Sequence, residues 1–193
     1  MRYSDEEIRK YFMQLDRSRF IDEQKELAVL DRPLPIGHGQ TISQPSLVLT
    51  MTLKLELDSE DKVLEIGTGS GFQTALLSKF SHAVYTVERI RALHERARER
   101  LTDLGYRNIH FHYGDGHEGW EEHAPYDKIM VTAAAEEMPE NLIKQLAPGG
   151  RMIIPVGSFF GQELKLIEKD DKGRISESTI EHVMFVKFKK DVE

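Results

Sequence analysis

Three glycines follow an apolar segment in the stretch VLEIGTGSG at residues 63–71. Glycine carries no Cβ, so Gly67, Gly69 and Gly71 would let the backbone turn sharply and approach a ligand closely. Their G-x-G-x-G spacing differs from the G-x-G-x-x-G spacing that places a pyrophosphate at the start of a helix. The stretch therefore predicts a binding turn for a ligand without a phosphate group.

Two acidic residues stand at the ends of the next two predicted strands. Glu88 ends VYTVE about twenty residues after the glycines, where a carboxylate can accept hydrogen bonds from both hydroxyls of a ribose. Asp115 follows the next strand in YGDG, within reach of an amino group on a base. Taken singly, Glu88 is equally explained as a surface acid beside Arg89, and Asp115 as a turn former. Their joint position after successive strands indicates adenosine.

The elements that must position these residues alternate regularly from residue 62 onward. Helical stretches at 72–80, 90–105 and 139–150 separate short β-rich runs at 62–66, 83–87, 109–113, 128–132 and 151–156. This order predicts an α/β fold with a mostly parallel sheet and helices on both of its faces. Two further runs, at 163–169 and 179–188, flank a polar turn and predict an antiparallel strand pair at one sheet edge.

The length of 193 residues, with 39% hydrophobic and 31% charged, predicts one domain. We expect a helical N-terminal cover with a substrate loop (1–60), a cofactor-binding βα core (61–157) and C-terminal antiparallel strands (158–193). No apolar run approaches the ~20 residues that cross a bilayer, and the N-terminal residues lack the apolar core of a secretory signal. A cytoplasmic protein without a membrane partner is the expectation.

Composition argues against several classes of site. The absence of cysteine excludes disulfides, thiolate metal ligands and cysteine nucleophiles. The histidines are scattered, and the pair His110 and His112 has no further ligand at a suitable spacing, so no metal is expected. A formal net charge of -7 argues against nucleic acid as a partner, because phosphate binding depends on clustered Lys and Arg.

The stretch GHGQTISQP at residues 37–45 has two interpretations. Ser and Thr accept hydrogen bonds from the free N–H groups of a first helical turn, and Pro suits that turn. Thr41 or Ser43 is therefore a candidate N-cap of a helix that starts near Pro45. Alternatively, the polar loop belongs to a functional site. The spacing leaves both interpretations open, and one residue can serve in both roles.

In chain order, these stretches resemble the protein-L-isoaspartate O-methyltransferase family. The resemblance runs from about residue 15 to about residue 188 and rests on LPIGHGQTISQP, VLEIGTGSGFQTALL, VYTVERI, YGDG and YDKIMVTAAAEEMPENLIKQLAPGGRMIIPVG. Many S-adenosylmethionine-dependent methyltransferases share the glycine turn, whereas GQTISQP followed by the VTAAA segment is more specific. The resemblance implies a Rossmann-like, seven-stranded methyltransferase sheet.

The resemblance also implies roles for individual residues. S-adenosyl-L-methionine would be the cofactor and S-adenosyl-L-homocysteine the product, and Ser43 matches the active-site serine of a loop that covers the cofactor and holds the substrate carboxylate. The implied catalytic residues are Ser43 and Thr41. The implied cofactor contacts are Glu65, Gly67, Thr68, Gly69, Ser70, Gly71, Glu88, Asp115, Gly116 and Thr132, and the implied substrate contacts are Thr41, Ile42, Ser43, Ala133, Val183, Phe185 and Val186.

The implied activity is methyl transfer to the free α-carboxylate of L-isoaspartyl residues in damaged proteins and peptides, which starts their repair to aspartate. We expect a monomer, because no amphipathic stretch is left over once the sheet is covered. The chain departs from the family pattern at His38, Ser46 and Lys187, and its N-terminal helical region is short. These departures leave open a small-molecule or nucleic-acid acceptor, or a cofactor-binding module without catalysis.

Overall fold

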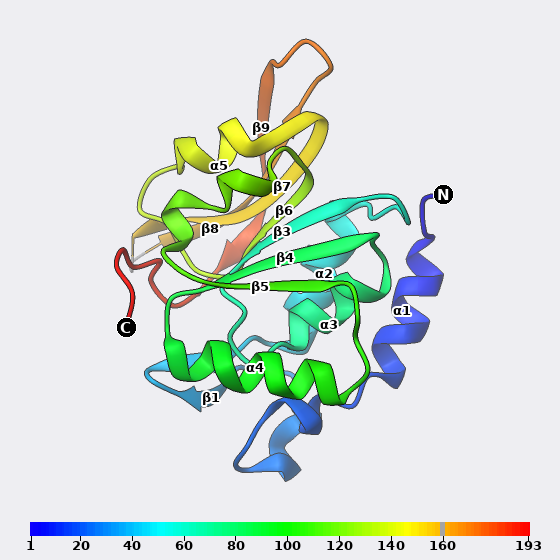
Figure 1. Ribbon diagram of the computed structural model, residues 1–193, viewed down its shortest axis with the longest axis vertical. Helices are drawn as coiled ribbons and strands as arrows, with labels where there is room; N and C mark the ends of the chain where they lie inside the picture. The colour runs from blue at the N-terminus through cyan, green and yellow to red at the C-terminus, as the bar shows by residue number, and fades with distance from the viewer. Residues whose placement is uncertain (159–160) are drawn as a thin grey trace.

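A seven-stranded sheet is the centre of this computed structural model, which describes residues 1–158 and 161–193 (Figure 1). Its strand order is β5-β4-β3-β6-β7-β8-β9; the first five strands in this order are parallel, and β8 and β9 are antiparallel to their neighbours. The predicted mostly parallel sheet with an antiparallel edge is therefore confirmed. The strands are β3 Lys62–Ile66, β4 Ala83–Glu88, β5 Ile109–Tyr113, β6 Tyr126–Val131, β7 Leu146–Ser158, β8 Gly161–Lys169 and β9 Ile175–Val183.

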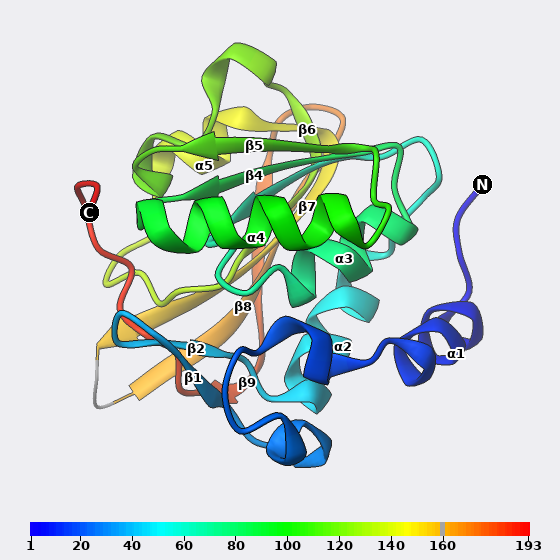
Figure 2. The same ribbon diagram turned by 60° about the horizontal axis from the view of Figure 1, so that its bottom comes forward.

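Helices cover both faces of the sheet (Figure 2). On one face lie α2 (Pro45–Leu55), α3 (Phe72–Lys79) and α4 (Arg91–Asp103), with α1 (Asp5–Gln14) packed beside α2. On the other face lies the short α5 (Glu140–Gln145), together with the 3-10 turns η3 (Gly116–Glu118) and η4 (Glu121–His123). Because successive strand side chains alternate between faces, the sheet carries two separate apolar clusters.

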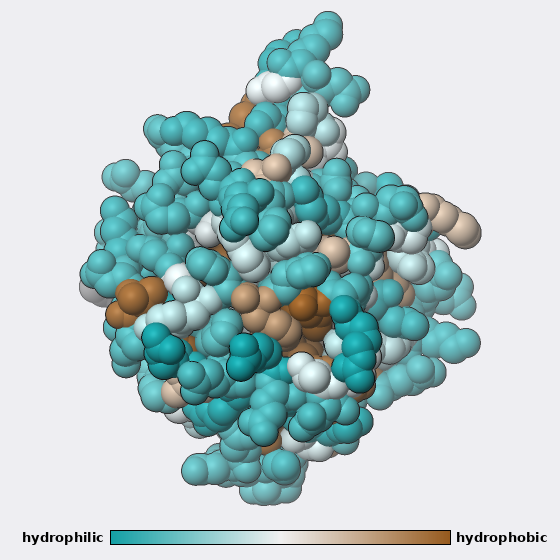
Figure 3. All heavy atoms as spheres, in the orientation of Figure 1, coloured by the Kyte–Doolittle hydropathy of each residue, from teal (hydrophilic) through white to brown (hydrophobic). Residues whose placement is uncertain are grey.

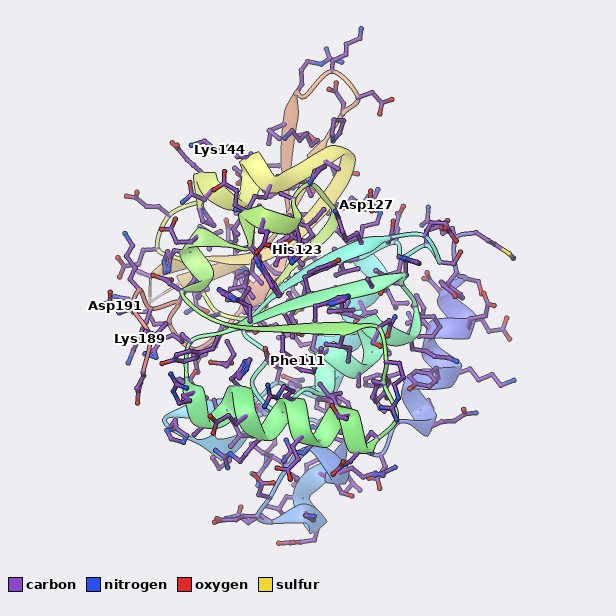
Figure 4. The ribbon with its side chains drawn as sticks, in the orientation of Figure 1. Phe111, His123, Asp127, Lys144, Lys189 and Asp191 are labelled. Atoms are coloured by element: carbon purple, nitrogen blue, oxygen red, sulfur yellow. The ribbon has the colours of Figure 1, made fainter. Side chains whose placement is uncertain are left out.

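Aromatic side chains at the outer sheet edge illustrate the two faces. Phe111 of β5 packs toward the cluster on the α4 side, whereas His123 lies on the opposite side of β5 (Figure 4). The His123 ring is 4.7 Å from the ring of Tyr85 and 4.7 Å from that of Trp120, between centroids. Mixed aromatic packing therefore covers the part of the sheet that the short α5 does not reach.

The sequence suggested a helical region for residues 1–60, but this region also contains a β-hairpin. α1 and α2 form where apolar residues recur at helical spacing, and η1 (Arg17–Phe20) and η2 (Lys25–Val29) lie between them. However, β1 (Leu34–Gly37) and β2 (Gln40–Ile42) pair as an antiparallel hairpin. Its turn, Gly37-His38-Gly39, has φ angles of 87°, 53° and 67°, a left-handed conformation that the two glycines adopt without strain.

Two predicted elements near the C-terminus end earlier than expected. The helix predicted for 139–150 stops at Gln145, because Pro148, Gly149 and Gly150 do not support a helix and form the beginning of β7. The strand predicted for 179–188 ends at Val183, so residues 184–188 lie outside β9. They run across the loop that follows β6, where Lys187 forms an isolated bridge with Ala134.

The face of the molecule in Figure 3 is mainly hydrophilic, and its apolar atoms gather in a recess over β5 and α4. Within the two described ranges, no helix is long and apolar enough to cross a membrane.

Candidate active site

The glycine turn connects β3 to α3. Gly67, Gly69 and Gly71 have φ angles of 92°, 54° and 87°, in the left-handed region that favours glycine. A Cβ on Gly67 would overlap the hydroxyl of Thr132, which follows β6 and lies 3.0 Å and 2.8 Å from the carbonyl oxygens of Ile66 and Gly67. The close approach of the two strand ends therefore requires glycine at position 67.

Glu88 ends β4 directly beside this turn. Its carboxylate accepts hydrogen bonds from the backbone N–H groups of Gly69 and Ile90, both at 2.9 Å, and the residue is 5% exposed. Burial raises the pKa of Glu88, and the backbone hydrogen bonds oppose that rise. A carboxylate fixed in this way is a preorganised acceptor for hydroxyl groups of a ligand.

Asp115 and Gly116 follow β5 and are placed differently. The carboxylate of Asp115 is the N-cap of η3, accepting from the N–H of His117 at 2.9 Å, and it also accepts from the N–H of Asp191 at 3.1 Å. Burial alone would raise the pKa of Asp115, but these hydrogen bonds bring it below its ordinary value. Gly116 lines the cavity at the carboxyl ends of β3, β4 and β6, and Asp115 does not. The predicted contact between Asp115 and an adenine stays a prediction.

Glu65 lies inside the sheet instead of in the cavity. Its Oε2 accepts hydrogen bonds from the hydroxyls of Thr74 and Thr86, both at 2.6 Å, while its Oε1 has no partner in the described part of the chain. Burial raises the pKa of Glu65 to about 8, against the effect of the two hydroxyls. Thr86 also lies 2.6 Å from the hydroxyl of Thr68, which lines the cavity. Glu65 therefore supports the cavity wall through a chain of hydroxyls.

The first of two adjoining cavities opens at the carboxyl ends of β3, β4 and β6. Its wall includes seven predicted cofactor contacts: Gly67, Thr68, Gly69, Ser70, Glu88, Gly116 and Thr132. Gly71, also predicted, instead begins α3 as its N-cap. Among the residues that the structure describes, no group of three or more His, Cys, Asp and Glu side chains is arranged to hold a metal ion.

Sequence reasoning missed part of this wall. Phe72 and Gln73 directly follow the glycine turn, and Ile90 follows Glu88 by two positions. Their closeness in the sequence to predicted cofactor contacts could have identified them as part of the cavity wall. Phe188 also lines the cavity, and its ring stacks on that of His117 with centroids 3.8 Å apart. No local pattern connects the C-terminal residues to the cofactor turn, so this contact arises from the tertiary fold alone.

A second cavity adjoins the first. Four residues line both cavities, namely Thr41, Ser43, Thr132 and Val186. They come from the N-terminal loop, the end of β6 and the C-terminal segment, and three of them carry a hydroxyl. Groups held in the two cavities can therefore meet at a junction lined with neutral hydrogen-bonding side chains.

Ser43 precedes α2 without capping it. The N-cap is Gln44, which makes no side-chain cap hydrogen bond. Instead, the carboxylate of Asp31 accepts from the N–H of Ser46 at 2.8 Å and from the side-chain amide of Gln44 at 3.0 Å. The interpretation of Thr41 or Ser43 as the N-cap is therefore wrong. Within the described residues the hydroxyl of Ser43 has no hydrogen-bond partner, which leaves it available at the junction.

The C-terminal segment bounds the junction from the other side. The N–H of Phe185 donates to Gln162 Oε1 at 2.6 Å, and its carbonyl accepts from Gln162 Nε2 at 3.2 Å. The carbonyl of Val186 accepts from the N–H of Ala134 at 2.8 Å. A peptide therefore cannot pair with the backbone of Phe185 in the way that an added strand would. Among the other predicted substrate contacts, Val183 and Phe185 line the second cavity, and Ile42 and Ala133 line the first.

The three departures from the family pattern are placed differently from one another. His38 is exposed at the tip of the β1–β2 turn, and Ser46 lines the second cavity. Lys187 lines the first cavity and forms an ion pair with Glu136 at 2.7 Å.

Comparisons with known proteins agree with this geometry. A model of the family "Protein-L-isoaspartate(D-aspartate) O-methyltransferase (PCMT)" matches residues 2–193. Protein-L-isoaspartate O-methyltransferase 2 of Syntrophobacter fumaroxidans is 51% identical over 184 residues, which cover 94% of this chain and 74% of that protein. The protein-L-isoaspartate O-methyltransferase of Pseudomonas aeruginosa is 52% identical over 172 residues, which cover 88% of this chain and 81% of the relative.

Solved structures show the same relationship. A protein-L-isoaspartate O-methyltransferase has a TM-score of 0.86 and 31% identity, and the match covers 96% of this chain but 62% of that longer chain. The Plasmodium falciparum beta-aspartate methyltransferase (PCMT), solved in complex with S-adenosyl-L-homocysteine, has a TM-score of 0.84 and 28% identity, covering 98% and 93% of the two chains. Because the family model matches residues 2–193 and the relatives from Syntrophobacter fumaroxidans and Pseudomonas aeruginosa are about half identical over most of the chain, this chain belongs to the protein-L-isoaspartate(D-aspartate) O-methyltransferase family.

Proposed function

We propose that this chain transfers a methyl group from S-adenosyl-L-methionine to the free α-carboxylate of L-isoaspartyl residues in damaged proteins and peptides, and so starts their repair to aspartate. The observation that carries the proposal is the junction of the two cavities. The first cavity, whose wall includes the Glu88 carboxylate, meets the second cavity at Thr41, Ser43, Thr132 and Val186. Family membership and the names of the relatives support the same acceptor.

The first cavity fits the proposed cofactor chemically. Ile66, Val87, Ile90 and Leu93 offer an apolar wall for a ring, and Glu88 offers a carboxylate for a ribose diol. The glycine turn lets the backbone approach a ligand closely, because its glycines have no Cβ. When bound, S-adenosylmethionine supplies a methyl group on a positively charged sulfur. Roles for the individual contacts remain part of the proposal.

The junction needs no strong base for this reaction. A carboxylate with an ordinary pKa near ~4 is already ionised at neutral pH, so no proton has to be removed before it attacks. The hydroxyls of Ser43 and Thr41 would orient the carboxylate oxygen toward the methyl carbon, and proximity and orientation can contribute several kcal/mol. Neutral donors suit this task, because stronger donors would stabilise the carboxylate more than a transition state in which its charge is being neutralised.

The proposal extends to the setting of the protein. We expect a monomer that acts in the cytoplasm as one domain, with isoaspartyl proteins and peptides as partners and no nucleic acid. The net charge of -7 and the hydrophilic face in Figure 3 support this expectation.

Two peptides of one sequence, differing only in an isoaspartyl or aspartyl linkage, provide the test. Each is incubated with the protein and S-adenosylmethionine that carries a labelled methyl group. We expect label on the isoaspartyl peptide alone, as a base-labile ester. Label on neither peptide, with S-adenosylmethionine still bound, would contradict the proposal and favour another acceptor or a non-catalytic cofactor-binding module.

A further inference from the structure

Arg17 is a buried cation in the N-terminal region. It begins η1 directly after Asp16, whose carboxylate caps that turn by accepting from the N–H of Ser18 at 3.0 Å. Arg17 is 6% exposed, whereas Arg19 in the same turn is exposed. Burial of a guanidinium is unfavourable unless its donors are satisfied, so its partners indicate its role.

The two terminal nitrogens of Arg17 donate only to backbone carbonyl oxygens, whereas its Nε has no partner among the described residues. Nη1 donates to Ala28 at 3.1 Å and to Leu30 at 3.2 Å. Nη2 donates to Arg32 at 2.9 Å and to Ser43 at 3.0 Å, and the carbonyl of Ile42 lies at the longer distance of 3.5 Å from the same nitrogen. In the described part of the chain, Arg17 forms no ion pair with a carboxylate within 4.0 Å. The side chain of Arg17 therefore links η2, the segment after η2 and the residues before α2 by hydrogen bonds.

Two of these carbonyls lie on either side of the Cα of Ser43. The carbonyl of Ile42 belongs to the peptide plane that precedes this Cα, and the carbonyl of Ser43 belongs to the plane that follows it. The orientations of the two planes determine φ and ψ of Ser43 and therefore the direction of its Cα–Cβ bond. Because the same nitrogen of Arg17 contacts both carbonyls, Arg17 fixes where the Ser43 side chain begins.

The residues that follow Ser43 are held by hydrogen bonds to the carboxylate of Asp31. Asp31 holds Gln44 and Ser46 at the start of α2, and Ile42 is buried at 3% exposure. The backbone around Ser43 is therefore held by an arginine on one side and an aspartate on the other, while the hydroxyl itself is left without a partner in the residues described. This arrangement orients a side chain without occupying its functional group.

We propose that Arg17 is the positioning residue of the acceptor loop: by holding the carbonyls of Ile42 and Ser43, it aims the Ser43 hydroxyl into the junction of the two cavities. The inference rests on the proposed methyl transfer to an isoaspartyl carboxylate. Lysine cannot replace Arg17, because one ammonium nitrogen cannot reproduce the spread of two guanidinium nitrogens over these carbonyls. The effect of a substitution should be confined to the acceptor side, since among the described residues no hydrogen bond of Arg17 reaches the glycine turn.

The test compares Arg17→Lys with Arg19→Lys, a matched change at the exposed arginine two positions away. We expect Arg17→Lys to lower kcat about tenfold or more while the Kd for S-adenosylhomocysteine stays within about threefold. Arg19→Lys should change neither. If Arg17→Lys is too unstable to purify, Arg17→Gln, which retains an amide donor without charge, takes its place.

A double-mutant cycle separates positioning from general destabilisation. If Arg17 acts through Ser43, then Ser43→Ala should lower kcat in the native chain but have little further effect beside Arg17→Lys. Additive losses would mean that Arg17 affects activity by another route and would overturn the inference. Absence of methyl transfer by the native chain would instead count against the proposed function.

Hydrogen exchange tests the same inference without any turnover. In Arg17→Lys, amides of residues 41–46 should exchange faster than in the native chain, while those of the glycine turn at 67–71 keep their rates. Unchanged exchange at residues 41–46 would overturn the inference whether or not the protein methylates isoaspartyl peptides.

Discussion

At the scale of single residues, Ser43 is our first candidate for a contact with the substrate carboxylate. It lines both cavities, and its hydroxyl has no hydrogen-bond partner among the described residues. We predict that Ser43→Ala lowers kcat for the isoaspartyl peptide roughly tenfold, equivalent to ~1.4 kcal/mol, through loss of one neutral hydrogen bond to the carboxylate. Binding of S-adenosylhomocysteine, followed by calorimetry, should change little.

Ser176→Ala is the matched control, since Ser176 is exposed on β9 far from the junction. An unchanged kcat in Ser43→Ala would show that this hydroxyl has no part in the mechanism. A large loss of S-adenosylhomocysteine binding would show that the hydroxyl serves the cofactor and not the substrate carboxylate.

Glu65 links a single residue to the pH dependence of stability. Burial raises its pKa from 4.5 to about 8 in the folded protein, so the folded state binds more protons than the unfolded state between these values. The stabilisation is therefore fully present below pH 4.5 and is lost as the pH rises through about 8. We predict that Glu65→Gln abolishes this component, which amounts to at most ~1.4 kcal/mol per pH unit.

Urea denaturation at several values between pH 5 and 8.5 measures this component as the difference between the native chain and Glu65→Gln. The native chain should lose stability relative to the variant as the pH rises. Glu99→Gln, on the exposed part of α4, should give a curve parallel to the native one. If the free energy of unfolding of Glu65→Gln changes with pH in parallel with that of the native chain, Glu65 is ionised in the folded protein across this range.

At the scale of elements, α4 holds the glycine turn. Arg100 donates from Nη1 to the carbonyl of Ser70 at 2.9 Å and from Nη2 to Asp22 at 2.6 Å, so it ties the turn to the N-terminal segment. We predict that Arg100→Ala raises the Kd for S-adenosylhomocysteine by roughly three- to tenfold, because the turn loses its support. Arg98→Ala, on the exposed face of the same helix, is the calorimetric control. Equal Kd values for the two variants would refute this role of α4.

The C-terminal segment is a second element that shapes the cofactor cavity. The labelled Lys189 and Asp191 lie near the carboxyl ends of the parallel strands (Figure 4), and Asp191 donates to Asp115 after β5. Glu193 donates from its N–H to the carbonyl of Arg89 at 2.7 Å after β4. The segment thus bridges the loops after β4, β5 and β6, which explains how Phe188 comes to line the cavity.

At the scale of the whole molecule, ligand binding should stabilise the fold, because the cavity is built from loops at the ends of several strands. At 100 times its Kd, S-adenosylhomocysteine should contribute ~2.7 kcal/mol and raise the Tm of a chain of this size by about 5–10 °C. Gly67→Ala should abolish the shift, since its Cβ would overlap Thr132. Gly161→Ala meets no atom within 4 Å and should retain it. A full shift in Gly67→Ala would contradict our assignment of the turn.

Local patterns in the sequence determined the central elements. β3 and β5 occur at the predicted residues 62–66 and 109–113, because short β-rich runs between helical stretches indicate strands. The positive φ angles of Gly67, Gly69 and Gly71 and the position of Glu88 at the end of β4 also followed from residue type and spacing. The roles of Thr41 and Ser43 came from family resemblance, since spacing alone also allowed a helix cap.

Only the tertiary structure decided how distant segments meet. The sequence gives no local sign that Arg17 contacts the carbonyls of Ile42 and Ser43, that Asp31 holds the start of α2, or that Phe188 lines the cofactor cavity. These contacts join residues far apart in the chain, and they depend on backbone carbonyl and amide groups that every residue type carries. The pattern of side chains along the chain specifies the strands and helices. The hydrogen-bond partners of buried backbone and charged groups are decided only when those elements pack against one another.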